Sequence, residues 1–461
     1  MAQGAGTLTG ACQAGAASVS RGTGRGKARR VLLAAACLAL AGLLAAPPFL
    51  VDLAAHPYHV DEDVWVESAY YYRLFFKDRN LRSPDWESSE ARHRPPIAKY
   101  TLGLGLDIAG CTFEADAGRL HSWWARNEHL PGVNPGMPPK RLLAARTTSA
   151  LLALAAGLVL FLIGWRISGP LAGLLMCVLF AYSPCGLLVF RQAMAESTLV
   201  FFSVAAVCVQ VWLLPALADF LRRPLSAVLF VLLESACLCG AVGTKLNGAL
   251  TAAAFVLATA LLSIIVIWPG LRSEDGQRRR LGQRLARSAL IPIVPAVVGM
   301  GAFALLVFLD PFLRPAPVGR FIEMFKAARE ALAASARPFP EDALPTLGSK
   351  AAYVFGALLS GRSVLLPQRV TLAVYAALFA AGFVILSGMT LRQALQGRLT
   401  GTLPVWAWAV TTLVGVTAWI PTDWERFLAP AIPVASCLAG LALAEALRFA
   451  WRRVAVGTPR W

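Results

Sequence analysis

The sequence predicts an all-α polytopic membrane protein, and three observations lead to this fold class. The 461 residues are 57% hydrophobic and 15% charged, with a mean hydropathy of +0.60, whereas soluble domains carry about 25% charged residues. Apolar stretches of about 20 residues, the length that crosses a bilayer, recur along the chain. Basic residues gather in alternate connections between these stretches. The composition excludes a cytosolic enzyme, a disordered chain and a secreted disulfide scaffold.

We expect about ten transmembrane helices. They cover residues 31–51, 142–164, 170–190, 197–216, 225–243, 249–268, 289–309, 370–389, 402–420 and 428–447. Residues 351–366 are apolar but interrupted by polar residues, which favours an interfacial or re-entrant helix. Residues 1–30 are predicted to be a disordered cytoplasmic tail and residues 448–461 a second cytoplasmic tail, so that one catalytic unit covers residues 31–447.

The distribution of charge predicts the orientation in the membrane. With both termini in the cytoplasm, the cytoplasmic segments contain twenty basic residues and four acidic residues. This asymmetry follows the positive-inside rule and predicts a multi-pass protein of the plasma (inner) membrane. The net charge of +17 is therefore a topology signal, and no nucleic-acid partner is expected.

Two long segments, residues 52–140 and 310–368, are then expected on the extracytoplasmic face. The first is unusually large and contains all five histidines of the chain. Most of the nine cysteines fall inside predicted spans, which argues against a disulfide framework or a zinc site.

Charged and polar residues at the outer ends of the spans carry the functional argument. They are Asp61, Glu62 and Asp63 after the first span, Arg94 and Lys99 in the same loop, Arg191 and Glu196 between the third and fourth spans, Lys245 and Asn247 between the fifth and sixth, and Asp423, Glu425 and Arg426 in the last outer turn. Cations placed at headgroup level suit a lipid-linked phosphate as leaving group. A carboxylate beside them suits a general base that activates an acceptor hydroxyl. One base suffices for a single displacement with inversion.

Simpler explanations exist for the same residues. Loop carboxylates are commonly solvated, and lysines and arginines at span ends reach toward headgroups without further function. Asp423 and Glu425 are expected to be able to pair with Arg426. A metal site formed by His56, His59 and His93 is the less favoured reading of the histidines. Glu234 lies inside a span, where we expect a partner on a neighbouring helix.

At these residues the sequence resembles glycosyltransferase family 39, the protein O-mannosyltransferases, within the GT-C class of polyprenyl-phosphate-sugar enzymes. The resemblance is carried by His59-Val60-Asp61-Glu62, Arg94–Tyr100, Phe190–Ser197, Gly240–Gly248 and Asp423–Pro430. One departure is that His93 is displaced by one position from the usual His-Pro-Pro, which places any role of His93 in doubt.

The resemblance implies a site and a reaction. Asp61 would be the catalytic base, with Glu62 positioning the donor or acceptor, and Lys99, Arg191, Lys245 and Arg426 would bind the donor phosphate. Arg94, Glu196, Asn247 and Asp423 are further candidates. The reaction would transfer mannose from a polyprenyl phosphate to a Ser/Thr hydroxyl of a translocated protein. A lipid or glycan acceptor and a transporter or flippase of lipid-linked substrates are the alternatives. No metal ligand set is assigned, and the need for a divalent metal stays open.

Overall fold

The computed structural model describes residues 24–59, 61–111, 137–217, 224–271, 291–336, 340–359, 368–396 and 401–457. These residues are almost entirely helical, and a single antiparallel bridge joins Ala343 to Thr422. The predicted all-α class is therefore confirmed. Of the predicted tails, residues 1–23 and 458–461 lie outside the described residues, and the first helix already begins at Gly24.

Eight of the described helices are long and apolar enough to cross a membrane. They are α1 (Gly24–Leu50), α7 (Pro139–Ser168), α10 (Glu196–Leu217), α11 (Pro224–Val242), α12 (Ala249–Leu271), α17 (Gln368–Leu395), α18 (Thr402–Trp419) and α19 (Ile432–Gly457). A bent pair of helices would raise the number to nine. Eight or nine of the roughly ten predicted spans therefore meet this length and composition within the described residues.

The two remaining predicted spans differ for local reasons. Residues 170–190 form α8 (Pro170–Ala181) and α9 (Pro184–Phe190), which are bent by 63°. Ser183 breaks the helix, because its hydroxyl caps the amide of Gly186 and Pro184 starts the new helix. The predicted span 289–309 is α14 (Ile293–Leu309), whose 17 residues rise about 26 Å, the lower limit for crossing a bilayer.

Small residues allow the membrane helices to pack closely. A Cβ atom on Gly164 would lie 2.7 Å from the Cα atom of Gly173, so α7 and α8 meet backbone to backbone. Gly169, at φ +84°, makes the tight turn between these two helices. Such contacts replace the hydrophobic effect as the source of cohesion between helices in lipid. Inside this bundle, the amide of Gln210 on α10 donates to Glu234 on α11 at 2.6 Å, which confirms the expected partner.

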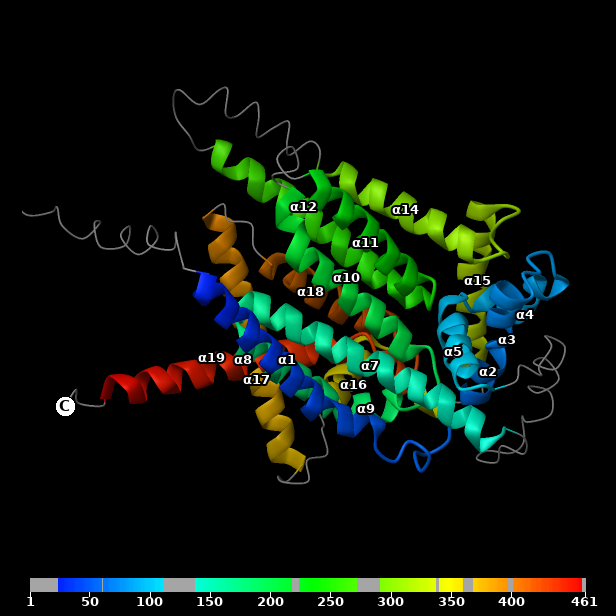
Figure 1. Ribbon diagram of the computed structural model, residues 1–461, viewed down its shortest axis with the longest axis horizontal. Helices are drawn as coiled ribbons and strands as arrows, with labels where there is room; N and C mark the ends of the chain where they lie inside the picture. Colours follow the sequence, from blue (N-terminus) through cyan, green and yellow to red (C-terminus); the bar gives the residue numbers. More distant parts are fainter. Residues whose placement is uncertain are drawn as a thin grey trace, which may run out of the picture.

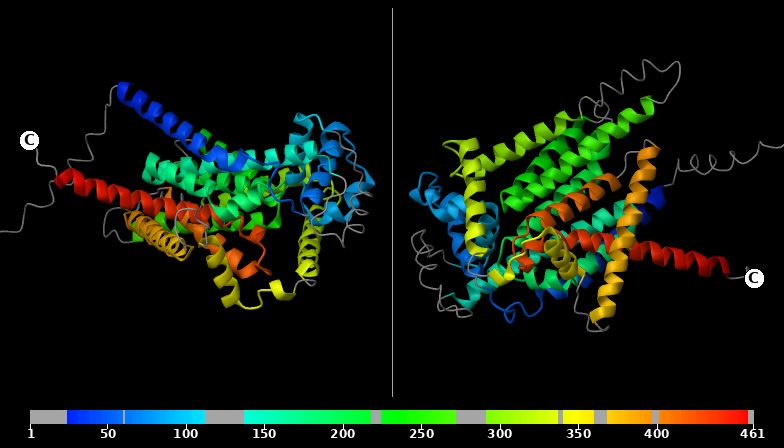
Figure 2. Two further views of the ribbon diagram at one scale, coloured as in Figure 1. Left: turned by 90° about the horizontal axis from the view of Figure 1, so that it is seen from below. Right: turned by 180° about the vertical axis from the view of Figure 1, so that it is seen from behind.

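Short helices and α15 gather at one end of the bundle, which we call the loop end (Figures 1 and 2). They are α2 (Asp61–Ser68), α3 (Tyr70–Tyr72), η1 (Arg73–Lys77), η2 (Pro84–Glu87), α4 (Ser89–His93), α5 (Ile97–Ile108) and α15 (Pro317–Ala336). Arg320 on α15 pairs with Glu87, which joins α15 to η2. The remaining elements are η4 (Leu246–Gly248), η5 (Pro340–Asp342), α16 (Leu347–Leu359) and η6 (Glu425–Leu428). Of the predicted helix 351–366, residues 360–366 lie outside the described residues.

Candidate functional site

Asp61 is the first residue of α2, one of the short helices at the loop end. Its carboxylate forms an ion pair with Arg426 of η6, 365 positions further along the chain. The guanidinium of Arg426 also lies over the rings of Trp424 at 4.6 Å and Phe427 at 5.5 Å. Burial lowers the pKa of Arg426 to about 10, so the side chain stays charged at neutral pH. The structure thus brings two of the predicted site residues together, from opposite ends of the sequence.

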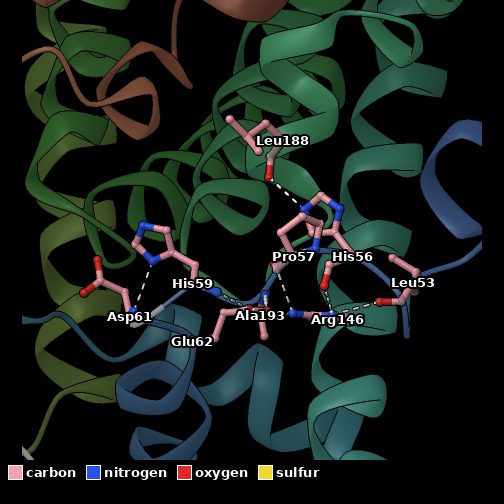
Figure 3. A network of polar contacts seen from close by, with 9 residues as sticks. All are labelled: Leu53, His56, Pro57, His59, Asp61, Glu62, Arg146, Leu188 and Ala193. Atoms are coloured by element: carbon pink, nitrogen blue, oxygen red, sulfur yellow. Dashed lines mark hydrogen bonds and ion pairs between the residues drawn. The ribbon is translucent and has the colours of Figure 1, made fainter. Parts of the chain in front are cut away.

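Glu62, the next residue, is fully buried and saturated with hydrogen bonds (Figure 3). Arg146 on α7 donates to both of its oxygens at 2.8 Å. The backbone amides of Ala193 and His59 donate to the same carboxylate at 2.8 and 2.9 Å. Glu62 therefore ties the start of α2 to α7 and to the segment before α10. Asp63 is buried as well, and burial raises its pKa to about 6.

Two further ion pairs meet on one aromatic ring. Lys245 pairs with Glu196 at the start of α10, and its ammonium lies 6.0 Å from the ring centre of Trp65. Arg94 pairs with Glu90 at 2.8 Å, and its guanidinium lies 5.3 Å from the same ring. Because Trp65 follows Asp61 by one helical turn, the ring brings both cations beside the first turn of α2.

These pairs share a pattern of exposure. The cations of Lys245, Arg94 and Arg426 keep 25, 23 and 21% of their side-chain surface. Their carboxylate partners Glu196, Glu90 and Asp61 keep 1, 11 and 14%. Each carboxylate is therefore less exposed than its cation, so the exposed surface of these pairs is mainly positive. Asp61 is the most exposed of the three acids. Such a surface is suited to an anion.

Lys99 lies below this surface. Its side chain on α5 is 1% exposed, donates to the carbonyl oxygen of Glu90 at 2.7 Å and lies 4.4 Å from the ring centre of Tyr71. Burial lowers the pKa of Lys99, and the charges of Glu90 and Asp310 counteract that shift. Burial likewise raises the pKa of Asp310, which is 2% exposed. The structure places Lys99 in an internal charge cluster that supports the loop carrying Arg94.

The other predicted residues lie around the margin. Arg191 donates to the carbonyl oxygen of Val51 at the end of α1. Asp423 is exposed, and its backbone amide donates to Asp342 at 3.0 Å. Asn247 lines a small apolar pocket. The other lining residues are Leu250, Gly415, Val416, Trp419, Ile420 and Phe427. Phe427 also contacts Arg426, so this pocket borders the ion pair of Asp61.

Sequence reasoning missed three residues of the site. Arg146 carries a signal, because a charge within the apolar stretch 142–164 needs a buried partner. Trp65 has a weaker signal, its spacing of four residues from Asp61. Asp310, directly after an apolar helix, resembles an ordinary helix end.

No group of three metal-ligating side chains occurs within the described ranges of the chain. His56 contacts the carbonyl oxygen of Leu188 at 3.2 Å, and the Nδ1 atom of His59 accepts the backbone amide of Asp61 at 3.1 Å. Both histidines thus take part in hydrogen bonds of the protein itself (Figure 3).

Comparison with known protein families adds a finding from the sequence itself. Residues 87–306 match the family described as dolichyl-phosphate-mannose-protein mannosyltransferase (PMT). The chain contains a PMT-family domain. This match confirms the resemblance inferred from the motifs, and it covers Arg94, Lys99, Glu196 and Lys245, whereas Asp61 and Arg426 lie outside it. Comparison with the sequences of curated proteins gives no significant match.

Solved structures resemble the fold over most of this chain. The oligosaccharyltransferase AglB of Archaeoglobus fulgidus, in complex with an inhibitory peptide and a dolichol-phosphate, gives a TM-score of 0.52 at 14% identity over 93% of this chain and 52% of its own. ArnT of Cupriavidus metallidurans in the apo state gives 0.50 at 16% identity over 92% of this chain and 62% of its own. The helical arrangement is thus the predicted GT-C-like fold, and the chain spans between half and two thirds of the length of these proteins.

Proposed function

We propose that this protein is a membrane glycosyltransferase that uses a polyprenyl-phosphate sugar as donor. The observation that carries the proposal is a set of three partly exposed cations near the first turn of α2. Arg426 pairs with Asp61, while Lys245 and Arg94 lie over the ring of Trp65, one helical turn after Asp61. The PMT-family domain supports this chemistry, and mannose is the sugar that the family suggests. Dolichol-phosphate in the complex of the structurally similar AglB supports a lipid-linked donor.

The geometry suggests how the reaction would proceed. The donor phosphate would bind Arg426, Lys245 and Arg94, drawing Arg426 away from Asp61. The apolar side chains beside Phe427 would contact the first part of the polyprenyl chain. These cations stabilise the negative charge that develops on the phosphate as the bond from the sugar C1 to the phosphate oxygen breaks.

Asp61, released from its ion pair, would act as the general base. The acceptor oxygen forms a bond to C1 from the face opposite the phosphate, while Asp61 takes the hydroxyl proton. The bonding electrons leave with the phosphate, which needs no proton, and the configuration at C1 is inverted. A Ser/Thr hydroxyl of a protein is the acceptor that the family suggests. The predicted orientation would place the reaction at the extracytoplasmic face.

Glu62, Lys99 and Arg191 take supporting roles in this proposal. Glu62 holds α2 against α7 through Arg146, and Lys99 holds the carbonyl of Glu90, whose carboxylate anchors Arg94. Arg191 fastens the end of α9 to α1.

The test is a transfer assay with purified protein in lipid nanodiscs, dolichyl-phosphate [14C]mannose and a Ser/Thr-rich peptide. Wild-type protein should label the peptide with inversion at C1, and Asp61→Asn should lower kcat by about 10²- to 10⁴-fold because the general base is lost. Asp78→Asn, an exposed carboxylate of the same outer segment that pairs with Arg73, is the matched control and should leave transfer unchanged.

Other outcomes would redirect the proposal. Label in a lipid or glycan fraction would keep the chemistry and replace the protein acceptor. Movement of intact donor across a proteoliposome membrane without cleavage would indicate a transporter and contradict the enzyme. Wild-type activity of Asp61→Asn would contradict Asp61 as base.

A further inference from the structure

The first turn of α2 is closed by two reciprocal hydrogen bonds that involve His59 (Figure 3). The Nδ1 atom of His59 accepts the backbone amide of Asp61 at 3.1 Å. In return, the backbone amide of His59 donates to Oε2 of Glu62 at 2.9 Å. The backbone amide of Glu62 also donates to the carbonyl oxygen of His59 at 2.9 Å. This resembles a helix capping box, with an imidazole in place of the usual serine or threonine, except that the side chain accepts the amide two residues further on rather than three.

An imidazole differs from a hydroxyl in this position because it titrates. Neutral histidine has one ring nitrogen without a proton, which can accept the amide of Asp61, whereas both nitrogens of the imidazolium are donors. Protonation of His59 therefore removes the acceptor and places the Nδ1–H group of the ring opposite the backbone N–H group of Asp61. The bond that ends on the amide of Asp61 exists only in the neutral form.

The surroundings of His59 come from three elements besides its own segment. Burial is the largest influence and lowers the pKa of His59, and Arg426 on η6 lowers it further. Glu196 on α10, Glu62 on α2 and Glu425 on η6 act in the opposite direction. The net direction is downward from the ordinary value of about 6.5. At neutral pH the cap is therefore intact.

We propose that His59 is a positioning residue, whose neutral imidazole holds the first turn of α2 and thereby aims the carboxylate of Asp61 at the acceptor hydroxyl. This inference rests on the proposed function, because it assigns Asp61 as the base. Its consequence is a loss of transfer at acidic pH that arises from His59 in addition to the titration of Asp61 itself. His59 touches neither substrate in this scheme and acts through the backbone of Asp61.

The experiment compares His59→Asn, which keeps a side-chain acceptor for the cap but cannot titrate, with His59→Ala, which removes it. His56→Asn is the matched control, a histidine of the same segment that lies outside the cap. The first readout is thermal unfolding in nanodiscs from pH 5 to pH 8 and needs no donor. As the pH falls below about 6.5, the unfolded wild-type chain binds a proton that the folded chain resists, so stability falls.

On this basis the Tm of the wild type should fall relative to that of His59→Asn in acid. Burial also lowers the pKa of His56, so His56→Asn should lose only the part of the acid dependence that His56 itself contributes and keep the part that comes from His59. His59→Ala should have a lower Tm at pH 8 than the wild type or His59→Asn. An equal dependence on pH in wild type and His59→Asn would overturn the titratable cap, whether or not the protein transfers sugar.

The second readout is the dependence of kcat on pH. His59→Ala should lower kcat by about tenfold or more through misplacement of the base, with a much smaller change in donor KM. His59→Asn should restore kcat at pH 8 and keep it to a lower pH than the wild type. The stability of the cap could depend on pH as expected while kcat has the same pH dependence in wild type, His59→Ala and His59→Asn. That result would overturn the role of His59 in aiming Asp61. A wild type that shows the stability effect but transfers no sugar would contradict the proposed function, and the positioning role with it, while leaving the cap established.

Discussion

Asp61 and Glu62 are neighbours in the sequence and each pairs with an arginine, yet the regions that they enter differ in their exposure to solvent. Asp61 and its partner Arg426 keep 14 and 21% of their side-chain surface, and Arg426 lies over Phe427 of the pocket of Asn247. Glu62 and its partner Arg146 keep 0 and 2%. Successive side chains of a helix point about 100° apart, so one carboxylate faces the surface and the other faces α7. Two adjacent acidic residues can therefore have different roles: Asp61 is accessible for chemistry, whereas Glu62 holds α2 against α7.

The largest expected effect tests the anchor. Arg146→Ala leaves Glu62 buried without its cation, which should lower the free energy of unfolding by about 3–5 kcal/mol. Denaturant unfolding of the detergent-solubilised protein would measure it. Arg73→Ala, which removes an exposed ion pair with Asp78, is the control and should change stability little. If Arg146→Ala were as stable as the wild type, the proposed difference between Glu62 as a structural group and Asp61 as a chemical group would be contradicted.

The second effect tests the surface pair. Arg426→Ala removes a charge-assisted contact to the donor phosphate worth about 1.5–3 kcal/mol, so donor KM should rise by about 10- to 100-fold. Stability should change far less than in Arg146→Ala, because Asp61 stays in contact with water. Arg426→Lys should recover only part of the loss, since an ammonium lacks the planar fork of the guanidinium. A large loss of stability in Arg426→Ala together with an unchanged donor KM would indicate that the pair of Asp61 and Arg426 is structural, like that of Glu62 and Arg146.

The smallest effect separates two roles of Lys245, binding of the donor phosphate and neutralisation of the buried Glu196. Lys245→Met should raise donor KM by about tenfold and lower stability, because Glu196 is then buried without its cation. Adding Glu196→Gln removes that buried charge and should restore stability while donor KM stays high. Thermal unfolding and donor titration of the single and double variants measure the two roles separately. Recovery of both quantities in the double variant would make Lys245 purely structural.

Features that depend on residues close together in the sequence were predictable, whereas contacts between residues distant in the sequence were not. The membrane fold depends on apolar length and charge asymmetry, which are local in sequence, so most spans were placed within a few residues. The bend at Ser183 was missed because a cap and a proline act over a single turn inside an apolar run. The outer-end charges were predicted as one set, and the sequence did not show which of them are buried and which are exposed. Lys99 and Arg94 lie five residues apart, yet one is buried beneath Glu90 and the other lies over Trp65.

Apolar spans, charge asymmetry and motifs are properties of consecutive residues, so the helical membrane fold and the PMT-family domain could be recognised from the chain alone. The pairing of Asp61 with Arg426 and of Glu62 with Arg146 could not, because these partners lie far apart in the chain. The burial of a charged group depends on helices that are distant in the sequence. Whether a carboxylate anchors a helix or faces a substrate depends on which of those helices covers it.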